Sequence, residues 1–327
     1  MIEKEISFDG INSAYGTIAI PQSEGVFPAI LILPGSGGLD RNGNDRKGKI
    51  QTNLYQNLAH FLTKLGFVTF RYDKIGTGKR EGNILTVGLS DLIADAEHAF
   101  QFLKAQPFVD SNRIILCGHS EGTIHATALA ETVNPAGIML LAGGVDNLIE
   151  ALKKQRQLAY HELLAKPGIQ GWLNRTLKID VKGEKQTENL MNKMINSNKD
   201  VIKIQLFFKQ PAKYFREHNA FNARASLTKV TCPVLAIQGD KDPLCDNSVL
   251  AELAELVQGK SEYLIIPNME HTLKEQTEPK NILNYQKHIK NTTNQPFHPE
   301  ALNKIAEWLT LNFGDKAASN EPIKAIK

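Results

Sequence analysis

Short runs of apolar, often β-branched residues alternate along the chain with longer segments whose apolar residues recur at helical spacing. Six runs predict buried strands, at residues 28–33, 67–72, 113–117, 136–141, 233–238 and 262–266. Two earlier runs, at residues 4–8 and 15–20, alternate between apolar and polar residues and predict antiparallel edge strands. Strands that alternate with helical segments are typical of an α/β fold with a mostly parallel sheet.

Helical periodicity fills the gaps between these strands. Apolar residues recur on one helix face in residues 54–65 and again in residues 89–103. Residues 299–313 predict a closing amphipathic helix that begins with proline, which is tolerated there because the first helical N–H groups have no partner within the helix.

The stretch between residues 144 and 230 breaks this rhythm. It contains no convincing strand, and two amphipathic stretches, residues 145–166 and 188–209, predict helices on either side of a Pro-Gly pair. About 85 residues are too many for a simple crossover. We therefore expect a core of residues 1–144 and 228–313, a helical cap inserted at 145–227, and a mobile polar tail at 314–327.

Composition narrows the class of protein. The chain has 327 residues, 42% of them hydrophobic, and its 38 basic and 35 acidic residues leave a net charge of +3 without a basic run that would predict nucleic-acid binding. The charged start MIEKEISFDG does not resemble an export signal, and no apolar stretch predicts a membrane span. Three cysteines without metal-type spacing, Cys117, Cys232 and Cys245, favour a reducing cytoplasmic location and no metal.

Candidate chemistry begins at Gly118-His119-Ser120-Glu121-Gly122. A predicted strand runs into this G-x-S-x-G sequence and a helix-compatible run follows, which is the arrangement that exposes a nucleophilic serine at a sharp turn. The alternative is a structural turn, because a chain of this length has about a one-in-ten chance of an accidental match. His119 is expected to support the turn, and His125 to be a packed helix residue.

A serine nucleophile needs a base and an acid, and both occur in loops after later predicted strands. Asp240 and Asp242 follow the strand at 233–238, and His271 follows the strand at 262–266. His288 and His298 are rivals for the base, but they lie in a polar stretch further on. The order serine, acid, histidine is the one expected for an open α/β sheet with this turn.

These motifs together resemble the α/β-hydrolase superfamily, and in particular bacterial carboxylesterases and acyl-peptidase-like serine hydrolases. The resemblance extends from about residue 14 to residue 313. It comprises GSGGLDR at 35–41, RYDK at 71–74, GHSEG at 118–122, GDKD at 239–242, and His271. The family's fold has about eight mostly parallel strands with flanking helices and, here, an inserted helical cap.

The resemblance also implies roles. Ser120 would be the nucleophile, His271 the base and Asp242 the acid, with Asp240 as the second choice for the acid. The backbone N–H groups of Ser36 and Glu121 would form the oxyanion hole. The substrate would be a small acyl compound, most simply a carboxylic ester. A peptidase or thioesterase with the same triad, or a non-catalytic binding protein on this fold, are the alternatives.

Further expectations concern neighbouring residues. Asp40 and Arg41 are predicted to form an ion pair that braces the oxyanion loop, and aromatic residues of the cap are expected either to line an acyl pocket or to form the core of the cap. These aromatic residues are Trp172, Phe207, Phe208 and Tyr214. The glycine-rich stretches at 35–40 and 76–80 each lack a residue that nucleotide-binding loops require, so no cofactor is predicted.

Overall fold

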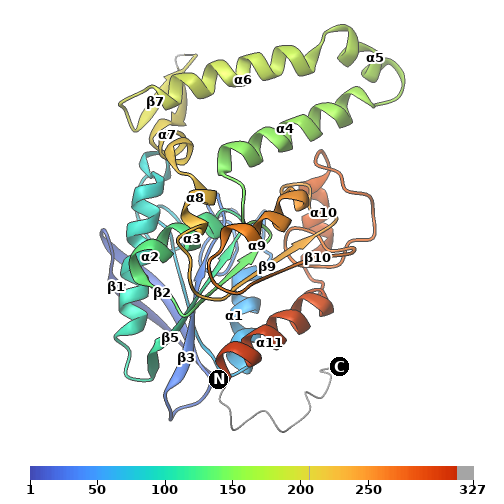
Figure 1. Ribbon diagram of the computed structural model, residues 1–327. Coiled ribbons are helices and arrows are strands. Elements are labelled where there is room, and N and C mark those ends of the chain that lie inside the picture. Colours follow the sequence, from blue (N-terminus) through green and yellow to red (C-terminus); the bar gives the residue numbers. More distant parts are fainter. Residues whose placement is uncertain (206, 315–327) are drawn as a thin grey trace.

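The computed structural model describes residues 1–205 and 207–314, and within them eight strands form one sheet in the order β1-β2-β4-β3-β5-β6-β9-β10 (Figure 1). Strand β1 pairs antiparallel with β2, and β2 pairs antiparallel with β4, whereas the remaining neighbours are parallel. The strands are β1 (Ile2–Asp9), β2 (Ser13–Ile20), β3 (Phe27–Leu33), β4 (Val68–Tyr72), β5 (Val109–His119), β6 (Gly137–Leu141), β9 (Val234–Gly239) and β10 (Ser261–Ile266).

The predicted strands and the α/β fold class are therefore confirmed. One detail of the prediction was wrong, because β2 is not an edge strand but lies between β1 and β4. Its burial explains the difference, since all of its residues from Gly16 onward are buried and its backbone pairs on both sides.

Helices cover both faces of the sheet, with α2 and α3 on one face and α1 and α11 on the other. The helices are α1 (Leu54–Lys64), α2 (Leu89–Lys104), α3 (Gly122–Val133), α4 (Leu148–Leu164), α5 (Gly168–Thr176), α6 (Ile179–Ile195), α7 (Ala212–Ala220), α8 (Ala223–Leu227), α9 (Leu253–Leu256), α10 (Tyr285–Thr292) and α11 (Pro299–Phe313). Two short 3₁₀ turns are η1 (Ile84–Thr86) and η2 (Asn247–Glu252).

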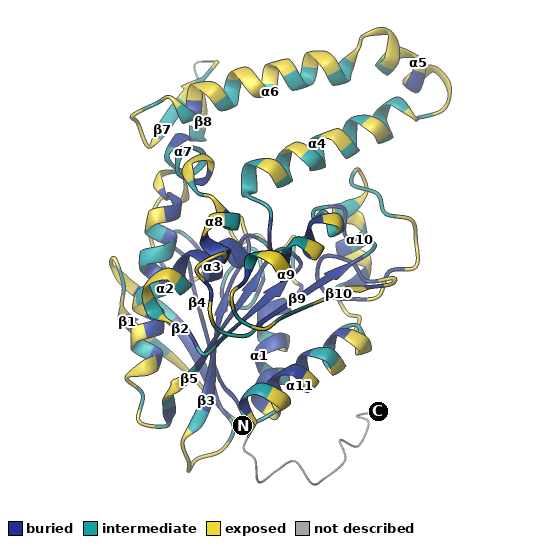
Figure 2. Cartoon of the chain, viewed as in Figure 1, coloured by how far each residue is buried: buried dark blue, intermediate teal, exposed yellow. Residues whose placement is uncertain are grey.

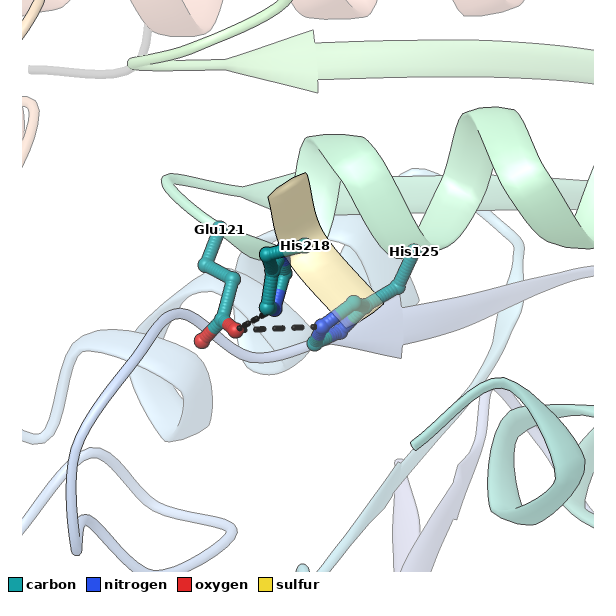
Figure 3. A group of neighbouring side chains, drawn as sticks. All are labelled: Glu121, His125 and His218. Carbon is teal, nitrogen blue, oxygen red and sulfur yellow. Dashed lines mark ion pairs between the residues drawn. The ribbon is translucent and has the colours of Figure 1, made fainter. Parts of the chain in front are cut away.

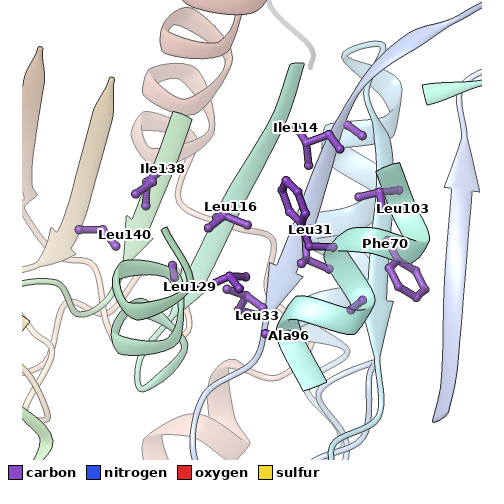
Figure 4. Close-up of a cluster of buried hydrophobic side chains, with 14 of the residues drawn as sticks. Leu31, Leu33, Phe70, Ala96, Leu103, Ile114, Leu116, Leu129, Ile138 and Leu140 are labelled. Atoms are coloured by element: carbon purple, nitrogen blue, oxygen red, sulfur yellow. The ribbon is translucent and has the colours of Figure 1, made fainter. Parts of the chain in front are cut away.

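The core has two halves because side chains of a strand alternate between the faces of the sheet. Leu31 and Leu33 of β3 point toward α2 and α3, as Figure 4 shows, whereas Ile30 and Ile32 pack with α1 and α11. Because both faces are covered, the central strands are continuously apolar rather than alternating. This is why their runs could be recognised in the sequence.

Residues 145–227, the cap segment, lie between β6 and β9 in the chain, and α4, α5 and α6 extend away from the sheet (Figure 1). The segment is not purely helical, so that prediction was wrong in part. Residues 188–209 are helical only as far as Ile195, and strands β7 (Val201–Ile204) and β8 (Phe208–Pro211) then pair as an antiparallel hairpin. The residues of β7 are mainly β-branched, and such side chains favour extended backbone over helix.

Few side chains of the outer cap helices are buried. Helix α4 has no buried residue among those described, and α5 and α6 bury only Gly171 and Met194, respectively (Figure 2). The division of the chain into core and cap remains a prediction. The predicted mobile tail lies, apart from Gly314, outside the described residues.

The two ends of the cap segment are held together at a neck. The side-chain oxygen of Asn147, at the start of α4, accepts a hydrogen bond of 2.7 Å from the backbone N–H of Ala223, at the start of α8. Next to it, the Arg224 guanidinium lies 3.2 Å from the Asp146 carboxylate. The intervening residues therefore form a loop that is closed at its base.

The segment after β4 is anchored by a buried ion pair. Both terminal nitrogens of the Arg80 guanidinium contact the carboxylate of Asp95 on α2, at 2.7 and 2.9 Å, and the two side chains are at most 2% exposed. No helix in the described part of the chain is long and apolar enough to cross a membrane.

We expect Asp95→Ala to lower the free energy of unfolding by about 3–5 kcal/mol, because it leaves the buried Arg80 guanidinium unpaired. As a control, Glu184→Ala removes the partly exposed pair with Arg156 and should cost less than about 1 kcal/mol. Urea denaturation of the three proteins measures both values. Equal losses in the two variants would contradict the assignment of Arg80–Asp95 as a buried anchor.

Candidate active site

Ser120 occupies a strained turn between β5 and α3. Its φ is 55°, in the left-handed region that costs a non-glycine residue about 1–3 kcal/mol. Glycines flank it because there is no room for side chains. A Cβ atom on Gly118 would lie 2.2 Å from the carbonyl oxygen of Gly122, and one on Gly122 would lie 2.1 Å from the carbonyl oxygen of Leu33.

The backbone of Ser120 is fully engaged, whereas its hydroxyl group is not. The N–H donates to the carbonyl of Leu141 at 2.9 Å, and the carbonyl accepts from the Thr123 hydroxyl at 2.7 Å. The Ser120 hydroxyl forms no hydrogen bond with any residue that the structure describes, and it faces a cavity of about 130 Å³. The turn thus holds the serine by its main chain and leaves its Oγ atom available for chemistry.

A buried imidazole–carboxylate pair lies in the loops after β9 and β10. His271 Nδ1 is 2.7 Å from Asp242 Oδ2, and their side chains are 6% and 0% exposed. The other Asp242 oxygen accepts the Leu244 N–H at 2.8 Å, which fixes the carboxylate. A proton on Nδ1 directed at the carboxylate leaves Nε2 of His271 free to accept a proton.

Burial alone would lower the pKa of His271, but the negative charge and hydrogen bond of Asp242 outweigh it, so that the pKa lies above its ordinary value of 6.5. For Asp242, burial acts to raise the pKa, yet the neighbouring His271 and the hydrogen bonds to the carboxylate lower it below 3.8. Asp242 is therefore an ionised group that stabilises a positive charge on His271.

The rival residues lie in other surroundings. Asp240 accepts the N–H of Asn268 at 2.7 Å and shapes the loop rather than meeting a histidine. His288 lies 3.4 Å from Glu278, and the backbone N–H of His298 donates to Leu273 at 2.7 Å. The geometry thus brings together His271 and Asp242 and leaves the rivals apart.

A hydrogen-bonded chain connects the serine turn to the loops on either side. The N–H of Gly35 donates to the Tyr55 hydroxyl at 2.7 Å, the hydroxyl lies 3.3 Å from His119 Nδ1, and His119 Nε2 lies 2.9 Å from the carbonyl oxygen of His271. Burial lowers the pKa of His119 to about 3. The neutral ring therefore donates from Nε2 and accepts at Nδ1, as this chain of hydrogen bonds requires.

The loop after β3 and the serine turn after β5 each present one unused donor. The backbone N–H groups of Ser36 and Glu121 donate to no residue in the described ranges. The ammonium group of Lys74, which is buried, donates to the carbonyl of Gly35. Together with Tyr55, this bond holds the Gly35 peptide, whose Cα would carry a Cβ only 3.0 Å from the Cβ of Ser120.

The predicted Asp40–Arg41 ion pair was wrong. Arg41 instead contacts Asp73 at 2.8 Å and Glu5 at 2.6 Å. Asp40 accepts the backbone N–H groups of Asn42 and Asn44, both at 2.9 Å. Asp40 therefore closes a turn, and Arg41 ties the loop to strands β4 and β1.

The cap aromatics divide into two groups. Tyr214 contacts the site, because its hydroxyl donates to Glu121 Oε1 at 2.7 Å. The other three neither line the cavity nor form a core, since Trp172, Phe207 and Phe208 are 59%, 83% and 64% exposed.

Two residues of the site, Tyr55 and Lys74, received no role from the sequence. Lys74 lies in the RYDK motif at 71–74. Tyr55 had no local signal, because its role depends on the packing of α1.

Glu121 lines two cavities. The cavity of about 130 Å³ is lined by Ser36, Ser120 and apolar residues of the cap segment, among them Leu148, Ala151 and Leu152. The second, of about 260 Å³, is mainly apolar and lies between Gly37, η1 and Tyr214. Apolar surfaces on both sides of Ser36 and Glu121 suit a substrate with apolar groups on both sides of a polar centre.

Comparison with known proteins gives a consistent picture. The family model described as "Serine aminopeptidase, S33" matches residues 50–278. Esterase EstD of Thermotoga maritima is 29% identical over 241 residues, which are 73% of this chain and 52% of that protein. This chain therefore spans about half the length of that relative.

Solved structures share the fold at low sequence identity. Est1E from Butyrivibrio proteoclasticus, bound to ferulic acid, has a TM-score of 0.58 and 17% identity over 92% of this chain and 99% of that one. The α/β hydrolase GrgF from Penicillium sp. sh18 has a TM-score of 0.59 and 14% identity, with coverage of 96% and 100%. The esterase Pf2001 of Pyrococcus furiosus has a TM-score of 0.54 and 15% identity, with coverage of 95% and 90%.

The serine turn leads to a prediction about stability. Gly122→Ala should lower the free energy of unfolding by about 1–3 kcal/mol or more, because the new Cβ overlaps the Leu33 carbonyl. Gly38→Ala is the matched control, since a Cβ there would meet nothing within 4 Å, and its effect should stay within about 0.5 kcal/mol. Denaturant midpoints measure both; a Gly122→Ala protein as stable as the control would contradict the close packing.

Proposed function

The chain belongs to the α/β-hydrolase family described as serine aminopeptidase S33, and from this premise we propose that it hydrolyses carboxylic esters through an acyl-enzyme on Ser120. The observation that carries the proposal is a strained serine with a free hydroxyl, together with a buried His271–Asp242 pair whose His271 carbonyl oxygen lies 2.9 Å from Nε2 of His119. The rings of His271 and of His119, the residue before Ser120, lie 5.0 Å apart. The relative named as an esterase supports the same chemistry.

In the first half of the reaction, His271 Nε2 accepts the Ser120 hydroxyl proton while Oγ forms a bond to the ester carbonyl carbon. Asp242 stabilises the imidazolium that results. Negative charge develops on the carbonyl oxygen, where the N–H groups of Ser36 and Glu121 are available to donate. Such a preorganised donor typically contributes about 10²–10³ to turnover.

The tetrahedral intermediate then collapses. The bond to the alkoxy oxygen breaks, and His271 gives the proton to that oxygen, so that an alcohol leaves and an acyl group stays on Ser120. A water molecule, deprotonated by His271, attacks the acyl carbon. The carboxylic acid departs as Ser120 Oγ regains its proton.

The cavities favour a class of substrate. The one beside Ser120 holds about 130 Å³, and a short apolar acyl or alcohol group matches its lining. The larger cavity suits the other part of the ester. A thioester or an amide uses the same triad, and the description of the family as an aminopeptidase keeps the amide in view. Rates on matched ester, thioester and aminoacyl-amide substrates distinguish the three.

We expect a fluorophosphonate to add one covalent adduct to the wild-type protein and none to Ser120→Ala, because the probe phosphorylates an activated serine. Intact-mass spectrometry measures the adduct. An unlabelled wild-type protein that is well folded would move the binding-protein alternative to first place. A labelled Ser120→Ala protein would place the nucleophile elsewhere.

The proposal also predicts a pH dependence. Only neutral His271 can act as the base, so kcat/KM should rise with pH, and the raised pKa of His271 places the midpoint above pH 6.5. Initial rates between pH 5 and 9 test this dependence, and a flat wild-type profile would argue against His271.

Asp242→Asn should lower turnover by about 10⁴-fold, because the substitution removes both the charge and the correct orientation of the ring.

A further inference from the structure

Three buried side chains that the proposed reaction does not use gather beside the serine turn. Glu121 precedes α3 and His125 lies one helical turn further on, whereas His218 comes from α7 in the cap segment (Figure 3). The three residues are 5%, 1% and 1% exposed, respectively. The cluster therefore spans the contact between the core and the cap, and its side chains are almost fully buried.

The ligating atoms converge on one point. Glu121 Oε1 lies 2.9 Å from His218 Nε2 and 3.6 Å from His125 Nε2, and all three atoms lie within 4.8 Å of one another. A tetrahedral Zn²⁺ site has metal–ligand bonds of about 2.0–2.2 Å, so its ligand atoms lie roughly 3.3 Å apart. The two distances from Glu121 lie on either side of that value.

Nε2 of each histidine lies at ion-pair distance from Glu121. Although His218 approaches the carboxylate closely, the direction does not fit a hydrogen bond, and Nε2 of both histidines lacks a hydrogen-bond partner among the described residues. Nδ1 of His218 lacks one too. Buried polar atoms without partners are rare in proteins and call for an explanation. One cation at the centre of the cluster would engage both Nε2 atoms and the carboxylate.

The surroundings supply access and a further ligand position. Glu121 and Tyr214 both line the cavity of about 260 Å³, which gives an ion a path and a place for a water molecule. The Tyr214 hydroxyl, 2.7 Å from Glu121 Oε1, is close enough to hydrogen-bond a ligating carboxylate. The ammonium of Lys74, which also lines this cavity, is engaged with the Gly35 carbonyl.

We propose that Glu121, His125 and His218 form a binding site for a divalent transition metal, with Zn²⁺ as the ion that fits best. Two imidazoles and a carboxylate form a ligand set that Zn²⁺ commonly takes. The ion would join α7 of the cap to the helix that begins at the serine turn. This role is structural, so it does not depend on which acyl compound the protein hydrolyses.

Part of this site has a signal in the sequence. Glu121 and His125 are spaced i, i+4, which places them on one face of a helix. The third ligand is distant in sequence and could not have been found by spacing. A second group, Asp242, Cys245 and His271, also has its ligating atoms within 4.8 Å of one another, but it contains the proposed triad. An experiment must therefore distinguish the two groups.

The test is a titration of the chelator-treated full chain with Co²⁺, followed by its visible absorption, and competition with Zn²⁺. Variants are His125→Ala, His218→Ala, Cys245→Ala and, as a control, His98→Ala, which alters an exposed histidine on α2. We expect one ion per chain with tetrahedral bands and no sulfur-to-metal charge transfer. Affinity should fall at least about tenfold in the first two variants and stay within about twofold in the others.

The proposal is overturned by an absence of binding to the wild-type chain, by affinity that is unchanged in both His125→Ala and His218→Ala, or by a thiolate band that disappears in Cys245→Ala. Circular dichroism checks that each variant folds, and His125→Gln and His218→Gln replace any alanine variant that does not. Repeating the titration on Ser120→Ala separates metal binding from ester hydrolysis, because that variant should bind the ion normally.

Discussion

The contact on which the site depends is a backbone contact, between Gly122 at the start of α3 and the carbonyl oxygen of Leu33 at the end of β3. Strands β3 and β5 are paired so that Leu33 lies opposite Gly118, and the chain after each strand must turn in the same small space. Ser120 takes a left-handed conformation because the turn is so short. Gly35 packs closely against Ser120. The loop after β3 and the serine turn therefore hold each other in position.

Burial explains which parts of this protein could be predicted. Central strands such as β3 and β5 are covered on both faces, so their sequences are continuous apolar runs that stand out. The His271–Asp242 pair could be predicted because both residues follow strands that end at the same edge of the sheet. Where burial is slight the patterns are weaker, and the pattern of residues 188–209 predicts one helix although a hairpin follows Ile195.

Other features arise only from packing between distant segments. Tyr55, Lys74 and His218 come from three different elements, and each meets the site through a contact that no local spacing encodes. Adjacency in sequence was also a poor guide to ion pairs, because neighbouring side chains of a loop point in different directions. Arg41 turns away from Asp40 to Asp73, 32 residues further along the chain.

The neck at Asn147 and Ala223 has a consequence for how such proteins diversify. Since the neck joins the two ends of the cap segment, the length of chain between them enters the folding free energy mainly as loop-closure entropy. That entropy changes slowly, by about 0.6 kcal/mol for each doubling of the loop. Insertions, deletions or exchange of the outer helices α5 and α6 are thus tolerable to the sheet, and an evolving lineage can alter the outer cap while the serine turn and the His271–Asp242 pair stay in place.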